Sequence, residues 1–408
     1  MRLKSILSLL LAAIMLAACG GTAPELEASP SPTAAIQATP TLEPSATFAP
    51  TATETPQPTQ TASPTATLPP VDYGPRDFPP NVNPLTGLPV ADPSRLDRRP
   101  VAIKIQIFPR GQRPTFGLAF ADIVYDFYQN SGLTRLHAIF YGSDSLQVGP
   151  IRSARILDGK LARIYKSIFA FGGADQRILD KISNTDYGNR LLREGSSACP
   201  AMCRIDPNGL NYLVANTAEL QAYALSRGID TSSQNLDGMR FAHQPPEGGA
   251  PGSQLFVRYS ISAYVRWDYD PLHNRYLRFQ DAQEASTVQE EAYQPFMDTS
   301  GSGQVQIAAD NVVVVFMTHQ NYLDIPYGPN EIIDIQLDAS GDAYLYRDGK
   351  VYPVRWAVPE REARLILVGA DGALVPFKPG VTWFQVVGES TTRSEAAPGV
   401  WRFESRLP

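Results

Sequence analysis

Three segments between residues 101 and 141 alternate apolar and polar side chains, and this pattern constrains the fold most strongly. Segment 101–108 (VAIKIQIF) places a β-branched apolar residue at every second position, which is typical of a β-strand. Segments 122–128 and 135–141 repeat the pattern, and Ser131-Gly132 between them is a turn signal. We therefore expect three strands here, two of them joined by a tight turn.

Helical patterns follow these strands. Residues 153 to about 166 carry an apolar stripe of helical spacing, and Ser153 is the expected N-cap. A short strand over 167–171 is expected to lead through Gly172-Gly173 into a helix from 174 to about 182. Asn216 is expected to cap a third helix that stops at Gly228. Mixed strands and helices predict a fold of the α/β to α+β class.

The chain beyond residue 234 contains only short β-type runs, many of them separated by Gly-Asp, Asp-Gly and Pro-Gly turns. The expected strands are 255–259, 263–267, 276–279, 311–317, 332–337, 343–346, 364–368 and 383–387. We therefore expect an N-terminal domain with helices over 79–235, a smaller, mostly-β domain over 236–392, and a tail over 393–408.

The N-terminus predicts export and lipid attachment. Arg2 and Lys4 precede an apolar run of about eleven residues, and Leu16-Ala-Ala-Cys19 follows. The run is too short to span a bilayer of roughly 30 Å. We expect residues 1–18 to be a lipoprotein signal peptide and Cys19 to be acylated (palmitate-type) on the extracytoplasmic face of the cell membrane.

Residues 19–78 are expected to form a disordered tether. Most of the segment is Pro, Thr, Ser and Ala, which cannot bury enough apolar surface to fold. Its functional interpretation is a spacer, open to O-glycosylation, and the alternative is an unconstrained linker. The whole chain has a net charge of −6 and no long Lys/Arg block, so we expect no nucleic-acid partner.

Cys199 and Cys203 are the other two cysteines, and outside the cytoplasm their spacing favours a short disulfide loop. The alternatives are a zinc site and a free redox pair. A zinc site needs four ligands, and no further Cys or His lies close in sequence. We therefore expect neither a metal nor a cofactor.

The segment Gly149–Arg155 (GPIRSAR) is the main candidate for chemistry. A turn at Gly149-Pro150 followed by a helix would bring Arg152, Arg155 and free backbone N–H groups to one point, which suits an anion. The alternative is that both arginines pair with internal carboxylates, of which Asp122, Asp126 and Asp158 are candidates.

Gly172-Gly173 marks a second junction between a strand and a helix, where a ligand could approach the backbone; the alternative is a simple tight turn. No nucleophile motif and no HExxH motif is present, and His137 is interpreted as a packing residue. Asp122 and Asp126 share one strand face about 13 Å apart, too far to act together on one bond.

Several of these motifs together resemble the YerB-like lipoproteins, a two-domain family of unknown function. The resemblance covers roughly residues 81–390 and implies a layered, β-rich α/β N-terminal domain and a β-rich C-terminal one, without implying any chemistry. The matching segments are 83–89, 99–102, 117–125, 132–135, 149–155, 265–269, 310–314, 348–350 and 379–383.

The chain departs from that family pattern at three places. Asn130 stands where a glutamate is expected, segment 207–212 lacks an expected histidine, and Phe296 replaces the histidine of a His-x-Asp. The arginine motif is intact, which favours binding over catalysis.

We interpret the chain as a membrane-anchored binding or scaffolding lipoprotein for an anionic cell-wall ligand or an envelope protein. The first alternative is an envelope hydrolase or transferase on wall polymers, with Asp122 or Asp126 as its base. The second is a purely structural partner of another envelope protein. The expected ligand-binding residues are Arg135, Arg152, Ser153, Arg155, Gly172, Gly173 and Asp122.

Overall fold

The computed structural model describes residues 71–408 except 207–211, 301–302, 325–327, 329 and 406–408. The predicted leader, Cys19 and the tether up to residue 70 lie outside these residues. The predicted tether end at residue 78 needs correction, because the folded part already includes residues 71–78. The Tyr73 N–H donates to the Phe241 carbonyl over 3.0 Å, and the Phe78 ring packs edge-on against the Phe241 ring.

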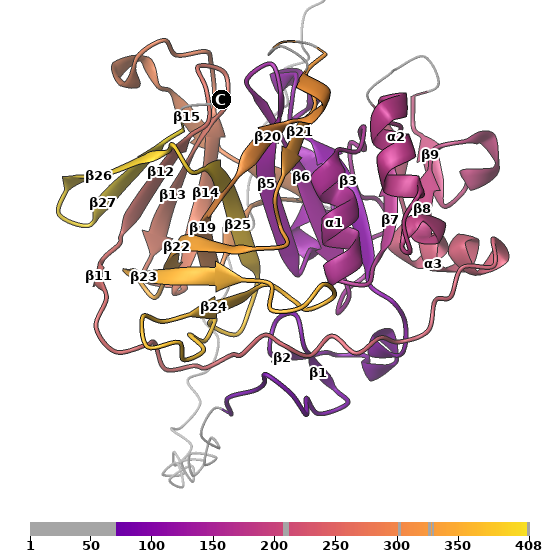
Figure 1. The fold of residues 1–408 in the computed structure, drawn as a ribbon, viewed down its shortest axis with the longest axis horizontal. Helices are drawn as coiled ribbons and strands as arrows, with labels where there is room; N and C mark the ends of the chain where they lie inside the picture. Colours follow the sequence, from indigo (N-terminus) through magenta and orange to yellow (C-terminus); the bar gives the residue numbers. More distant parts are fainter. Residues whose placement is uncertain (1–70, 207–211, 301–302, 325–327, 329, 406–408) are drawn as a thin grey trace, which may run out of the picture. The chain divides into compact units, whose positions relative to one another are not determined.

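An 11-stranded mixed sheet runs through both halves of the chain (Figure 1). Its order is β11, β23, β22, β19, β25, β5, β6, β3, β7 and β8, with β24 beside β23. The halves meet where β25 runs parallel to β5, with Thr382 opposite Ile123. The N-terminal half contributes β3 (Val101–Gln106), β5 (Ile123–Asn130), β6 (Leu133–Phe140), β7 (Ile168–Phe171) and β8 (Leu191–Arg193). The C-terminal half contributes β11 (Ala250–Pro251), β19 (Asn311–Met317), β22 (Ser340–Arg347), β23 (Lys350–Ala357), β24 (Ile366–Val368) and β25 (Thr382–Gly388).

The three strands expected near the start of the fold are confirmed as β3, β5 and β6. Ser131 and Gly132 both have positive φ (52° and 76°), which is the backbone twist that a two-residue hairpin turn requires. The hairpin tip is also held from outside, because the Ser260 hydroxyl donates to the Gly132 carbonyl over 2.5 Å.

Three α-helices occur in the described part of the chain: α1 (Ile156–Ile164), α2 (Gln176–Ser183) and α3 (Thr217–Ser226). Asn216 caps α3 as predicted, accepting from the Ala218 and Glu219 N–H groups. The predicted cap of α1 is wrong: Arg155, not Ser153, is the N-cap residue. The helix starts later because the Asp158 carboxylate in its first turn accepts the Arg155 N–H over 2.6 Å.

A second sheet of seven strands packs against one face of the central sheet. Its strand order is β15, β14, β13, β12, β27 and β26, with β18 beside β14. Residues 393–408 were expected to be a tail, but they hold β26 and β27. Trp401 and Phe403 are buried at alternate positions of β27. The strands are β12 (Gln254–Arg258), β13 (Tyr264–Asp270), β14 (Arg275–Asp281), β15 (Tyr293–Pro295), β18 (Ala308–Ala309), β26 (Thr392–Ala397) and β27 (Val400–Glu404).

The remaining strands form small sheets at the periphery. They are β1 (Val82–Asn83) with β2 (Leu88–Pro89), β9 (Met202–Arg204) with β10 (Leu213–Ala215), β20 (His319–Asn321) with β21 (Ile333–Ile335), and β4 (Thr115–Phe116) with β16 (Met297–Ser300) and β17 (Gly303–Gln306).

The central sheet is therefore covered on both faces. Helix α1 lies over β3 and β6 in Figure 1, and its Asp158 side chain contacts Lys104 and His137 from these strands. The opposite face packs on the seven-stranded sheet through a shared apolar cluster that includes Val124, Leu136 and Trp267. The strand-rich architecture, with its helices in the N-terminal domain, confirms the α+β end of the predicted fold class.

Candidate functional site

Three predicted elements meet beside the N-terminus of α1. The Arg152 N–H donates to the Lys104 carbonyl over 3.0 Å, which fixes segment 149–155 along β3. The Gly172 N–H donates to the Arg152 carbonyl over 3.0 Å, and the Arg135 Nη1 donates to the Ser153 carbonyl over 3.1 Å. The structure thus brings together six of the seven predicted ligand-binding residues. We call this group the arginine site; it comprises Arg135, Arg152, Ser153, Arg155, Gly172 and Gly173.

The three guanidinium groups of the arginine site form no ion pair with any carboxylate of the described residues. Arg155 instead donates to two neutral oxygens, the Ala154 carbonyl and the Asn130 Oδ1, each over 2.9 Å. The Arg152 side chain has no hydrogen-bond partner among the described residues. The internal pairing considered in the sequence analysis is thus not present in this part of the chain.

The nearest carboxylates are already occupied. Asp158 Oδ1 accepts from Lys104 Nζ over 3.0 Å and lies 2.9 Å from His137 Nδ1, while Oδ2 takes the Arg155 N–H. Asp175 is held by Arg177, which donates Nε and Nη2 to its two oxygens. Neither acid forms an ion pair with an arginine of the site, although the charges of both attract Arg155.

The electrostatics of this region follow from burial and like charge. Burial, with repulsion from Arg155 and Arg152, lowers the pKa of Arg135 to about 9. Burial also lowers the pKa of Lys104 to about 7, against the attraction of Asp158, and it lowers the pKa of His137. Burial alone would raise the pKa of Asp158, but Lys104 and His137 hold it below its usual value.

The seventh predicted residue, Asp122, lies elsewhere, and its assignment to the ligand site is wrong. It precedes β5, whereas Arg135 pairs with Phe127 further along that strand, about 17 Å away at strand rise. Strand position alone could not reveal which end of β5 the arginines approach.

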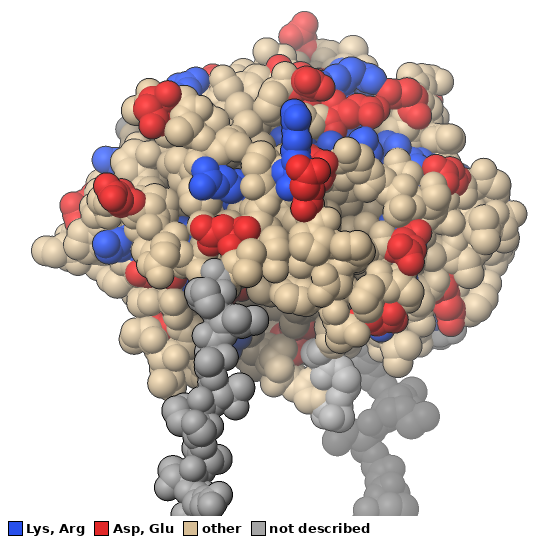
Figure 2. Space-filling view, turned by 90° about the horizontal axis from the view of Figure 1, so that it is seen from below, with Lys and Arg blue, Asp and Glu red and all other residues tan. Residues whose placement is uncertain are grey.

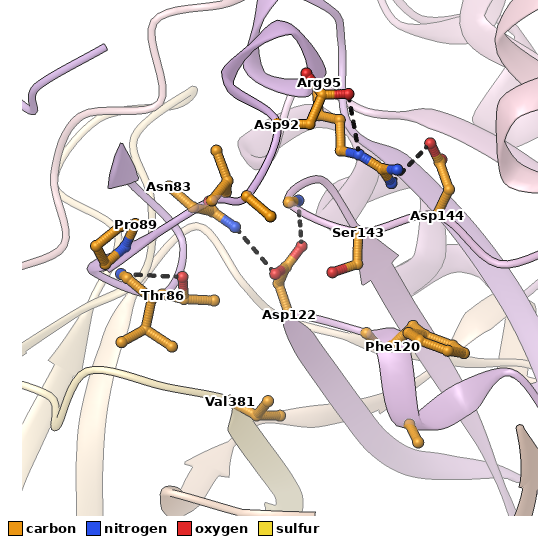
Figure 3. Close-up of a pocket in the computed structure, with 16 residues that line it drawn as sticks. Asn83, Thr86, Pro89, Asp92, Arg95, Phe120, Asp122, Ser143, Asp144 and Val381 are labelled. Carbon is orange, nitrogen blue, oxygen red and sulfur yellow. Dashed lines mark hydrogen bonds and ion pairs between the residues drawn. The ribbon is translucent and has the colours of Figure 1, made fainter. Parts of the chain in front are cut away.

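Asp122 instead forms part of a cavity of about 520 Å³ lined by β1, β2 and the segment 142–144 (Figure 3). Its carboxylate accepts from Asn83 Nδ2 and from the Tyr141 and Gly142 N–H groups. Burial raises its pKa to about 6, against these hydrogen bonds. Because the observed protein donors meet both carboxylate oxygens, we interpret Asp122 as a structural acceptor.

Asp126, the other candidate base, is buried between the two large sheets. Its Oδ2 accepts from Arg278 Nη2 over 2.6 Å, and both side chains are fully buried. The hydrolase alternative based on Asp122 or Asp126 therefore finds neither carboxylate beside the arginine site.

The remaining sequence predictions fall outside this site. Cys199 and Cys203 are joined by a disulfide between Cα atoms 4.9 Å apart, next to β9. The described residues contain no group of three or more His, Cys, Asp or Glu side chains that could hold a metal ion. Within the described ranges, no helix is long and apolar enough to cross a membrane.

Sequence reasoning missed the buried set of Lys104, His137 and Asp158 beneath the arginine site. His137 was assigned to packing, and Lys104 was not considered because it occupies a polar position of an alternating strand. The missing information was that α1 covers this face.

On the surface drawn in Figure 2, cationic and anionic side chains are interspersed, so that face shows no broad patch of one sign.

The fold and the site define a two-domain α+β protein whose N-terminal domain carries three clustered arginines, none of them ion-paired with a carboxylate of the described residues. The chain belongs to the DUF3048 family, because the sequence models of its N-terminal and C-terminal domains, both described as of unknown function, match residues 85–230 and 255–384. This membership confirms the resemblance to YerB-like proteins.

One relative is the Bacillus subtilis (strain 168) protein named "Putative lipoprotein YerB". It is 28% identical over 312 residues, which span 74% of this chain and 85% of the relative. The crystal structure of the YerB protein from Bacillus subtilis matches with a TM-score of 0.58 and 24% identity, covering 76% of this chain and 97% of that chain. This structural likeness supports the fold.

Proposed function

We propose that this protein is a membrane-anchored extracytoplasmic lipoprotein that binds an anionic envelope ligand at the arginine site. The observation that carries the proposal is the convergence of Arg135, Arg152 and Arg155 with no carboxylate partner among the described residues. The anchor is Cys19, and the name of the Bacillus subtilis relative supports this part of the proposal.

The physical argument concerns the cost of unpaired positive charge. Arg135 and Arg155 are largely buried, and desolvation together with mutual repulsion disfavours their charged forms. An anion placed among them removes the repulsion and gains charge-assisted hydrogen bonds. The site with a bound anion is thus lower in free energy than the empty site, and this difference favours binding.

The side chains are only partly covered. Arg152, Ser153 and Arg155 each retain intermediate exposure, and a side chain added at Gly173 would meet no atom within 4 Å. An anion can therefore reach the guanidinium groups from solvent without displacing core residues.

The test is calorimetry on the full chain in detergent, titrated with phosphate-bearing and carboxylate-bearing cell-wall fragments. We expect Arg155→Ala to weaken binding by tens of fold, because charge-assisted contacts contribute roughly 1.5–3 kcal/mol each. Arg155→Lys should recover part of the loss, since lysine restores the charge without the forked geometry.

The matched control is Arg355→Ala on β23, which removes a half-exposed guanidinium paired with Asp342 on β22. It changes the net charge equally and should leave binding unchanged. An equal loss in both alanine variants, or no binding by the native chain, would contradict the proposal. Steady product formation from a wall polymer would favour an enzyme instead.

A further inference from the structure

We infer that the arginine site selects a terminal phosphate monoester over carboxylates and phosphate diesters. This inference rests on the proposed function and narrows its ligand class. It is carried by the number of unoccupied donors at the site and by the number of uncompensated charges.

The unoccupied donors outnumber what a carboxylate can accept. Neither the N–H nor the hydroxyl of Ser153 has a hydrogen-bond partner in the described part of the structure, and the same holds for the Gly173 N–H. The Arg152 guanidinium adds up to five further donors, of which none is engaged by a described residue. A terminal phosphate offers three acceptor oxygens, whereas a carboxylate offers two in one plane.

The backbone between these donors is held in place. Gly173 accepts the Ala154 N–H over 2.8 Å, and Gly172 donates to Arg152 over 3.0 Å. A Cβ at Gly172 would lie 3.7 Å from the Arg152 Cα, so the two segments are in direct backbone contact. The donors of Ser153 and Gly173 therefore belong to one fixed junction and not to independent loops.

The charge at the site also favours a dianion. Lys104 lies 3.0 Å from Asp158, but its pKa of about 7 leaves it mostly neutral at pH 7.5, so the ionised Asp158 contributes one negative charge beside the arginines. His137 beside them has a pKa lowered by burial and is neutral at pH 7.5. The three positive charges of Arg135, Arg152 and Arg155 then exceed the single negative charge of Asp158 by two. A phosphate monoester carries close to two negative charges at that pH, while a diester or a carboxylate carries one.

The experiment compares three small probes by calorimetry on the full chain in detergent at pH 7.5. Methyl phosphate is the monoester, dimethyl phosphate has the same tetrahedral centre with one charge, and acetate is the planar monoanion. We expect methyl phosphate to bind at least about tenfold more tightly than either of the others. Its second negative charge is attracted by the guanidinium groups, and its third oxygen accepts a further hydrogen bond.

The two variants that test the assignment are Arg152→Ala and Ser153→Ala. Arg152→Ala should reduce the preference for methyl phosphate over acetate by about tenfold. Ser153→Ala removes one hydroxyl donor and should weaken methyl phosphate severalfold while leaving acetate unchanged. Arg355→Ala should alter neither affinity nor preference.

The outcomes separate this inference from the proposed function. Equal affinity for all three probes overturns the phosphate assignment while the anion site stands. Preference for acetate does the same. If no probe binds and no larger wall fragment binds either, the proposed function fails together with the inference.

Discussion

At the scale of single residues, the arginine site depends on which atoms oppose each guanidinium group. Arg155 faces the neutral Asn130 Oδ1 at 2.9 Å, and Arg135 faces a backbone carbonyl. Neutral acceptors satisfy hydrogen bonds but leave the charge in place. An acidic residue at the same distance would satisfy both, so residue 130 determines how much positive charge the site presents.

We therefore expect Asn130→Asp to weaken anion binding. The new carboxylate would pair with Arg155 and compete with the ligand, for a loss of roughly tenfold in affinity. Calorimetry with methyl phosphate measures the change. Asn130→Ala is the matched control, because it removes the hydrogen bond without adding charge and should cost less. Equal effects of the two variants would show that the charge at residue 130 is unimportant.

The pH dependence of stability tests the buried Lys104–Asp158 pair. The pKa of Lys104 is about 7 in the folded state against 10.5 for an ordinary lysine, so the unfolded state binds more protons between these values. The free energy of unfolding should therefore rise with pH across this window, by up to about 1.4 kcal/mol per pH unit. Urea unfolding at several pH values measures this slope.

The comparator for the pH experiment is the double variant Lys104→Met with Asp158→Asn, which removes both charges from the buried site. In this double variant, the free energy of unfolding should rise less steeply with pH between pH 7 and 10.5 than in the native chain. The difference between the two slopes is the contribution of Lys104. The same slope in both proteins would mean that Lys104 titrates near its ordinary pKa.

At the scale of elements, sequence patterns predicted those strands and helices whose bounds do not depend on contacts with other parts of the chain. β3 was predictable because it alternates, β5 and β6 because strand-type residues flank the Ser131-Gly132 turn, and α3 because Asn216 and Gly228 mark its ends. β23 was missed because Pro353 lies within it, and proline usually argues against a strand. The start of α1 was misplaced because its cap uses Asp158 inside the helix.

β27 shows how a short strand can be structurally important. It runs parallel to β12 and places the fully buried Phe403 in the core between the two large sheets. We expect Phe403→Ala to lower the free energy of unfolding by about 3–5 kcal/mol, as large-to-small core changes do. Urea denaturation followed by tryptophan fluorescence measures the loss.

The control for β27 is Thr392→Ala on the exposed strand β26, which should change stability by no more than about 0.5 kcal/mol. If Phe403→Ala were equally mild, residues 393–408 would be a dispensable tail, as the sequence alone had indicated.

At the scale of the whole molecule, the sequence predicted individual strands and helices better than the order in which the strands pair. The parallel pairing of β25 with β5 joins residues more than 250 positions apart, and no local pattern encodes such a contact. The arginine site was predictable in outline because its residues lie on adjacent segments. The misassignment of Asp122 came from the same missing information, the direction in which β5 runs past the site.

The anchor is the feature that would place the whole molecule at the membrane. If Cys19 is the acylated residue, Cys19→Ser leaves no thiol for the lipid, and the protein should be released from the membrane fraction or keep its leader uncleaved. Fractionation and mass spectrometry of the N-terminus distinguish these two results. The matched control replaces Cys199 and Cys203 with serine and keeps Cys19, so that protein should stay at the membrane with its leader removed. Retention of the Cys19→Ser chain at the membrane with a cleaved leader would require another anchor, and the extracytoplasmic binding role would then need a different basis.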